Sequence, residues 1–200
     1  MLGIFLDTET NGLSLLKHKV IEIAFEIVDM MTGEVLATFQ SIVSTTQEEW
    51  KKSDKESLRI NGFTWEQVAL GISPQAVGAS IEKLFIENKI KRGQAVFICQ
   101  NPSFDRAFFS QLVDPEKQEA LLWPYHWLDL ASMYWVKALE KANLNQGPFP
   151  WENGLSKDKI AASYKLNSEQ NPHRAINGVN HLILCYESVV GFPKKPKVSK

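Results

Sequence analysis

The chain has 200 residues, of which 44% are hydrophobic and 22% charged, and this is the composition of one soluble globular domain with a substantial core. Its formal net charge of −1 excludes a general affinity for polyanions, so any contact with nucleic acid must come from a local patch or from bound metal ions. The apolar start is short and an aspartate interrupts it, and no other stretch is long enough to span a bilayer. We therefore expect neither a signal peptide nor a membrane partner.

The first dozen residues combine an apolar strand with two carboxylates. Residues 2–6 form an apolar run typical of a buried strand, and Asp7 and Glu9 follow it. Side chains two residues apart in a strand point to one face, so both acids project together before Asn11 and Gly12 turn the chain. Neighbouring carboxylates repel unless a proton or a cation joins them, and oxygen ligands suit Mg²⁺ or Mn²⁺. The alternative is a surface turn that the two acids merely cap.

The next segments predict an antiparallel meander followed by helices. Residues 20–29 and 35–43 have the apolar character of strands, and the connections between them and the first strand are short. A short helix is expected at residues 57–61, and a longer one begins at Pro74. Residues 95–99 then form a buried strand, parallel to the first because a helical crossover precedes it.

A third acid stands at another junction between a strand and a helix. Ser103 is expected to cap this helix, with Asp105 in its first turn, and the alternative role of Asp105 is to complement the helix dipole. Residues 125–130 predict a fifth strand that leads into a helix over residues 131–139. We expect Asp129 to be the N-cap of that helix rather than a catalytic residue.

The C-terminal part predicts a loop, two helices and a charged tail. Residues 143–153 are rich in Asn, Gly and Pro, as loops are, and residues 155–164 suggest a helix. His173 lies in the segment that opens the last helix. Residues 191–200 form a basic tail, for which a solvated end is preferred to a nucleic-acid-binding arm. The lysines of this tail are Lys194, Lys195, Lys197 and Lys200.

Two cysteines occur, and both have apolar neighbours. Cys99 follows Val96-Phe97-Ile98, and Cys185 follows Leu182-Ile183-Leu184. Buried thiols are expected at both positions rather than a disulfide, because cysteine is among the residues most often buried. A cytoplasmic location follows from this expectation.

Three segments together resemble the motifs of the DEDD 3′–5′ exonucleases, a branch of the ribonuclease H-like superfamily that includes the proofreading subunit of bacterial DNA polymerase III. Residues 5–13 match the first motif and residues 101–105 the second, while the third, of the histidine subtype, begins at His173. The resemblance implies an α/β fold with a ribonuclease H-like mixed five-stranded sheet, its first three strands antiparallel, flanked by helices. We expect an exonuclease-like domain over residues 1–190 and the tail at 191–200.

The third motif departs from the family pattern. In the family an aspartate stands five positions after the histidine, whereas five positions after His173 this chain has Gly178. Neither Asp nor Glu occurs between His173 and Cys185. Glu169 and Asn180 are the nearest stand-ins, but neither has the family spacing. The fourth carboxylate is therefore missing, and an acid restored at residue 178 is expected to tighten metal binding.

The resemblance implies a role for each matched residue. Asp7 would bridge two ions, Mg²⁺ or Mn²⁺. Glu9 would hold the ion that binds the attacking water, and this ion would be weakly held because the fourth acid is missing. Asp105 would support the other ion, and His173 would take the proton from the water. The positions expected to bind substrate are Leu13, Asn101 and Phe104. For Leu13 and Phe104, ordinary packing is the alternative.

Two functions remain open at this point. The first is a working 3′–5′ exonuclease that hydrolyses phosphodiester bonds at the 3′ ends of single-stranded DNA or RNA. The second is a catalytically weak or inactive exonuclease-like domain that binds nucleic-acid ends or a protein partner. The joint presence of the three acids and His173 favours the first. The sequence does not distinguish DNA from RNA, and it predicts no oligomeric state.

Overall fold

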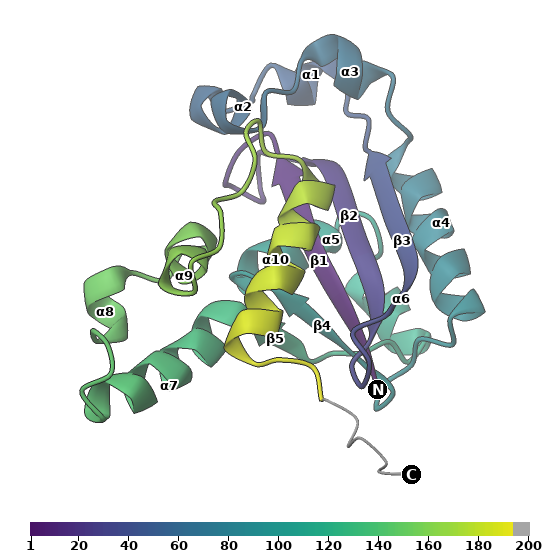
Figure 1. Ribbon diagram of the computed structural model, residues 1–200. Helices are drawn as coiled ribbons and strands as arrows, with labels where there is room; N and C mark the ends of the chain where they lie inside the picture. Colours follow the sequence, from purple (N-terminus) through teal and green to yellow (C-terminus); the bar gives the residue numbers. More distant parts are fainter. Residues whose placement is uncertain (194–200) are drawn as a thin grey trace.

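Five strands form one mixed sheet in the computed structural model, which describes residues 1–193 (Figure 1). The strands are β1 (Leu2–Thr10), β2 (Val20–Asp29), β3 (Val35–Ile42), β4 (Ala95–Cys99) and β5 (Trp127–Asp129). Their order in the sheet is β3-β2-β1-β4-β5. The first three are antiparallel to one another, while β4 is parallel to both β1 and β5. The predicted fold class is confirmed.

Helices cover both faces of this sheet. They are α1 (Gln47–Trp50), α2 (Lys55–Asn61), α3 (Trp65–Ala69), α4 (Pro74–Glu87), α5 (Pro102–Phe109), α6 (Pro115–Ala120), α7 (Leu130–Asn143), α8 (Pro150–Asn153), α9 (Lys157–Ser163) and α10 (Ala175–Val189). Helix α10 crosses one face over β1 and β2, and α7 to α9 extend from the same side (Figure 1). None of the helices within residues 1–193 is both long and apolar enough to cross a bilayer.

The central strand β1 alternates between two cores. Ile4 and Leu6 pack with residues of α4 and α5, whereas Phe5 packs with residues of α7, α9 and α10. Asp7 and Glu9 continue the alternation of Phe5, so they face the side of α10. The strand extends past the predicted end at residue 6 because β2 pairs with it as far as Thr10. The two acids therefore stand on backbone that is paired with β2, beyond the last residue that pairs with β4 and just before a register shift between Glu9 and Thr10.

A buried carboxylate of β2 caps the N-terminus of α10. The N-cap residue, Arg174, has no capping side-chain bond, but Glu22 Oε2 accepts a 2.7 Å hydrogen bond from the N–H of Ala175. Gln40 Nε2 donates to the other oxygen of Glu22 at 2.9 Å, and Glu22 is buried. Because a helix N-terminus carries free N–H groups and partial positive charge, this carboxylate fixes the start of α10 over the sheet.

Helix α2 fastens the end of β1 to the segment before α10. Asn61 Nδ2 donates to the carbonyl of Thr10 at 3.0 Å, and the N–H of His173 donates to the carbonyl of Ile60 at 3.2 Å. The Arg174 guanidinium donates to the carbonyl of Asn61. These bonds bring the C-terminal end of β1 and the backbone of His173 to one place.

Several local predictions can be compared with this fold. The helix at 57–61 is confirmed as α2, and Asp129 is confirmed as the N-cap of α7, since it accepts from two N–H groups of that helix. The predicted cap at Ser103 is wrong. Pro102 occupies the first turn of α5, so the N-cap falls on Asn101, whose φ of 59° is left-handed. Ser103 instead donates to the Asn101 side chain at 2.7 Å.

The thiol prediction is confirmed, since Cys99 and Cys185 are both free and buried. The basic tail lies almost wholly outside the described residues. Its lysines, all beyond residue 193, are Lys194, Lys195, Lys197 and Lys200.

We expect Glu22→Ala to lower the free energy of unfolding by about 1–3 kcal/mol, because the cap of α10 and a buried hydrogen bond to Gln40 are lost together. Urea denaturation measures the effect, and faster amide exchange at the start of α10 would localise it. The matched control is Glu26→Ala on the same strand, where a half-buried carboxylate accepts only a 3.3 Å bond from Thr38. Equal losses in the two variants would contradict a capping role for Glu22.

Candidate active site

A cavity of about 280 Å³ opens at the C-terminal ends of β1 and β4, between α5, α9 and the segment before α10. The ionisable side chains that line it are Asp7, Glu9, Asp105, Lys157, Asp158, Glu169 and His173. The structure therefore brings together the three acids and the histidine that the motifs single out. We call this cavity, with those side chains, the site cavity.

The three predicted substrate-binding residues are placed differently. Phe104 lines the site cavity. Leu13 and Asn101 are not among its described lining residues: Leu13 is 77% exposed, and the Asn101 side chain accepts the hydrogen bond from Ser103. Leu13 is too exposed for ordinary packing within the protein, so its side chain is free to contact a substrate. Substrate binding by the three residues stays a prediction.

Asp105 enters the site cavity from the first turn of α5. Thr8 lies on the opposite face of β1 from Asp7 and Glu9, and its Oγ1 donates to Asp105 Oδ1 at 2.8 Å. Asp105 is 3% exposed. The alternation of side chains along β1 thus points Asp7 and Glu9 to one face, while Thr8 on the other face orients Asp105.

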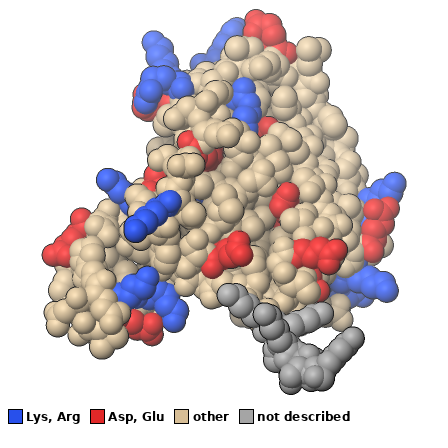
Figure 2. Space-filling model, in the orientation of Figure 1, with Lys and Arg blue, Asp and Glu red and all other residues tan. Residues whose placement is uncertain are grey.

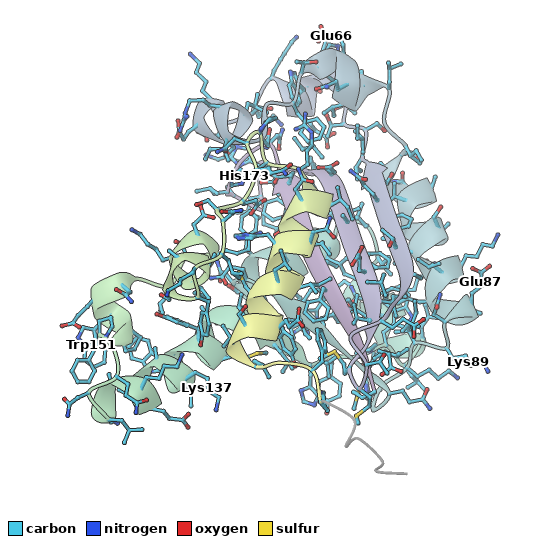
Figure 3. All side chains as sticks on the ribbon, in the orientation of Figure 1. Glu66, Glu87, Lys89, Lys137, Trp151 and His173 are labelled. Atoms are coloured by element: carbon cyan, nitrogen blue, oxygen red, sulfur yellow. The ribbon has the colours of Figure 1, made fainter. Side chains whose placement is uncertain are left out.

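His173 lies just before α10 rather than inside it (Figure 3). Its side chain is about one third exposed, and Nδ1 is 3.9 Å from Glu169 Oε1. The backbone bond to Ile60 holds the residue where α2, β1 and α10 converge. A partly exposed imidazole held by its main chain can exchange protons with solvent without losing its place.

Lys157, which the sequence analysis did not single out, lies in the middle of the acids. Its Nζ is 2.7 Å from Glu169 Oε2 and 3.6 Å from Asp7 Oδ1. It also donates to the carbonyl of Gly178 at 3.2 Å. The Lys157 side chain is only 12% exposed, so this ammonium is paired with protein groups rather than with water.

The close approach of α10 to β1 depends on Gly178. A Cβ built there would overlap the Asp7 carboxylate and lie 3.1 Å from Lys157 Nζ. The expectation that an acid at residue 178 would fit facing Asp7 is therefore wrong for this arrangement. Asp7 and Lys157 already fill the space that such a side chain would need.

The acids of the site cavity carry more negative charge than the protein compensates. Burial, with the charge of Asp7 next, raises the pKa of Glu9 to about 8. Burial raises the pKa of Asp7 to about 6, although Lys157 opposes the shift, and burial and Asp7 hold the pKa of Asp105 well above its ordinary value. Burial acts to lower the pKa of Lys157, but the charges of Asp7 and Glu169 outweigh it and raise that pKa. A further positive charge would stabilise this cluster.

The donor set fits a hard divalent cation. Ligand atoms of Glu9, Glu169 and His173 all lie within 4.8 Å of one another. Glu169 Oε1 is buried and has no hydrogen-bond partner among the described residues. Carboxylate oxygens, which Glu9 and Glu169 supply, are the ligands that Mg²⁺ and Mn²⁺ prefer.

Glu169 and Lys157 line the site cavity, but no motif in the sequence identifies them as site residues. Glu169 precedes His173 by four positions, whereas the family spacing places an acid five positions after the histidine. Lys157 begins a short helix, a position typical of a solvated lysine. The sequence offers one signal, which is the spacing: Glu169 is an acid four residues before the motif histidine, His173.

Comparisons with known proteins identify the family of the chain and show its fold in solved structures. The sequence model of the exonuclease family RNase_T matches residues 4–181. Among solved structures, cell-death related nuclease 4 superposes with a TM-score of 0.70 at 15% identity, over 93% of this chain and 62% of that one. The zinc-bound complex of Escherichia coli exonuclease I with single-stranded DNA gives 0.70 at 15%, over 94% and 40%.

A third neighbour spans a similar length. The nuclease domain of 3′hExo, described as a DEDDh family member bound to rAMP, gives a TM-score of 0.67 at 13% identity, over 97% of this chain and 94% of that one. At such identities the superpositions show the shared fold. This chain spans less than two thirds of the first two structures. No curated protein sequence matches it significantly.

We expect Gly178→Ala to lower the free energy of unfolding by about 1–3 kcal/mol through overpacking against Asp7. In an ordinary helix interior the same change stabilises by about 0.5–1 kcal/mol, so the sign alone is informative. Asn180→Ala, two residues along α10 and exposed, is the matched control. Urea denaturation of both variants is the measurement. If Gly178→Ala is more stable than the wild type, the Asp7 and Lys157 side chains can move aside without cost and overpacking is contradicted.

Proposed function

This chain belongs to the RNase_T exonuclease family, of the DEDD type, and we propose that it is a metal-dependent 3′–5′ exonuclease acting on single-stranded nucleic acid. One observation carries the proposal. The carboxylates of Asp7, Glu9 and Asp105, from two separate parts of the chain, share one cavity with the imidazole of His173. Hydrolysis of a phosphodiester needs positive charge beside the phosphate and a base beside the attacking water, and this cavity offers residues for both.

The proposal includes two divalent ions, Mg²⁺ or Mn²⁺. Asp7 is the residue that both ions would share, with Glu9 on one side and Asp105 on the other. In support, the charge of Asp7 acts on both neighbours and raises the pKa of each, after burial. Bound divalent ions would neutralise charge on the phosphate oxygens and make water a better nucleophile.

His173 is the residue proposed to take the proton of the attacking water. Its Nδ1 faces Glu169 Oε1 at 3.9 Å, so the opposite nitrogen, Nε2, is the one left to accept that proton. The exposure of one third of the side chain gives the proton a way out to solvent.

The proposed substrate is the 3′ end of single-stranded DNA or RNA. Among the structural neighbours, exonuclease I is bound to single-stranded DNA and 3′hExo to rAMP, so either sugar is represented. Lys and Arg side chains are interspersed with Asp and Glu on the face drawn in Figure 2, which favours attraction at the site cavity over attraction by a broad surface. Phe104 offers an apolar surface to the terminal nucleotide. The free thiols support a cytoplasmic location.

One observation favours a second candidate, an inactive domain that binds nucleic-acid ends or a protein partner. The Lys157 ammonium lies 3.6 Å from Asp7 Oδ1 and can compete with a cation for that carboxylate. A domain whose cation position were permanently filled in this way would bind strands without cleaving them.

We expect the protein, with Mn²⁺, to shorten 5′-labelled single strands from the 3′ end, whatever their sequence, because the acids are placed to hold phosphate rather than to read bases. DNA and RNA strands are compared on a sequencing gel, and a closed circular strand is the control. Cleavage of the circle would show an endonuclease. Retarded but intact strands in a mobility-shift assay would favour the second candidate.

We expect His173→Asn to slow cleavage by about 10²–10⁴-fold while Mn²⁺ affinity stays within about twofold, because a general base is lost and no cation ligand is. Single-turnover rates and calorimetric titration measure the two quantities separately. The control is His126→Asn, at an exposed histidine just before β5. A large loss of Mn²⁺ affinity in His173→Asn would make the imidazole a cation ligand instead.

A further inference from the structure

Glu169 is a buried carboxylate that uses only one of its two oxygens. It lies between α9 and α10, and its side chain is 3% exposed. Oε2 is 2.7 Å from Lys157 Nζ, whereas Oε1 is buried without a hydrogen-bond partner among residues 1–193. A buried polar atom left without a hydrogen-bond partner is destabilising. A cation beside Oε1 would remove that cost.

The first turn of α9 fixes the orientation of Glu169. The N–H of Glu169 donates to Asp158 Oδ1 at 2.9 Å, so the backbone is held as well as the side chain. Lys157, the neighbour of Asp158, reaches the carbonyl of Gly178 at 3.2 Å with the same ammonium that binds Oε2. Helix α9 therefore holds Oε2 and leaves Oε1 directed elsewhere.

Glu169 also belongs to a group of side chains whose ligand atoms lie close together. Ligand atoms of Glu9, Glu169 and His173 lie within 4.8 Å of one another. The two carboxylates of this group, those of Glu9 and Glu169, could hold a divalent ion between them, with the imidazole of His173 beside it.

We infer that Glu169 supplies the carboxylate ligand that residue 178 cannot. A divalent cation would be held between Glu9 and Glu169, with Lys157 as a positioning residue that binds the other oxygen of Glu169. The acid has thus been moved from α10 to the segment before it. This inference rests on the proposed function only in requiring that a divalent cation binds.

Two substitutions of Glu169 test whether its carboxylate binds the cation directly or only contributes negative charge nearby. Glu169→Gln keeps an oxygen for Lys157 and removes the charge. Glu169→Asp keeps the charge but shortens the side chain by one methylene, so it no longer reaches both Lys157 and the cation. If Glu169 is a ligand, both variants weaken Mn²⁺ binding by at least about tenfold, the lower end of what changes in a metal site's supporting shell produce. Glu116→Gln, an exposed acid of α6, should bind Mn²⁺ as the wild type does.

Calorimetric titration of the full chain with Mn²⁺ is the experiment, with circular dichroism to show that each variant is folded. Lys157→Met combined with Glu169→Gln removes both members of the ion pair, and this variant serves if either single change at Glu169 prevents folding. It too should bind at least about tenfold more weakly.

Three outcomes would overturn the inference: unchanged affinity in both Glu169 variants, a loss in Glu169→Gln with normal affinity in Glu169→Asp, or no Mn²⁺ binding by the wild type. The nuclease assay is independent of these readings. Weakened binding in both variants without any strand shortening by the wild type would uphold the ligand and reject the exonuclease. Strand shortening with unchanged affinity in both variants would do the reverse.

Discussion

The buried ammonium of Lys157 joins three parts of the fold that are far apart in the sequence. It contacts Asp7 of β1, Glu169 of the segment before α10, and the carbonyl of Gly178 within α10. Removing one member of a buried ion pair leaves the other charge buried without a partner. The stability lost in this way is larger than the net stability that the intact pair contributes. The positions of α9, α10 and the end of β1 are therefore mutually dependent at this ammonium, and the shape of the site cavity depends on it.

The ammonium can lie there only because residue 178 has no side chain. A Cβ at that position would overlap the Asp7 carboxylate and press on Lys157 Nζ. Within this fold, an acid at 178 and a lysine reaching in from α9 are alternatives for one space. In this chain residue 178 has no side chain, and Lys157, which is bound to Glu169, lies in the space beside it. The glycine alone does not indicate a decayed site.

Local patterns in the sequence predicted the parts of this site that local structure determines. Alternation along β1 put Asp7 and Glu9 on one face, and the strand-to-helix junction put Asp105 in a first turn. The cap at Ser103 failed because Pro102 shifts the helix start, a competition between two local signals. Lys157 was missed for another reason: its burial arises from the packing of α9 against α10, and no periodicity around a short helix reports that contact.

The charge balance argues for a cation independently of any family likeness. Asp7, Glu9, Asp105 and Glu169 face one ammonium, and that ammonium is already committed to Asp7 and Glu169. A phosphodiester entering the site cavity adds another negative charge. At a separation of about 4 Å and an effective dielectric constant near 20, each like-charge contact costs about 4 kcal/mol. Lys157 cannot offset several such contacts while holding Glu169 in place. In the proposed function, divalent cations bound by these acids would offset that charge.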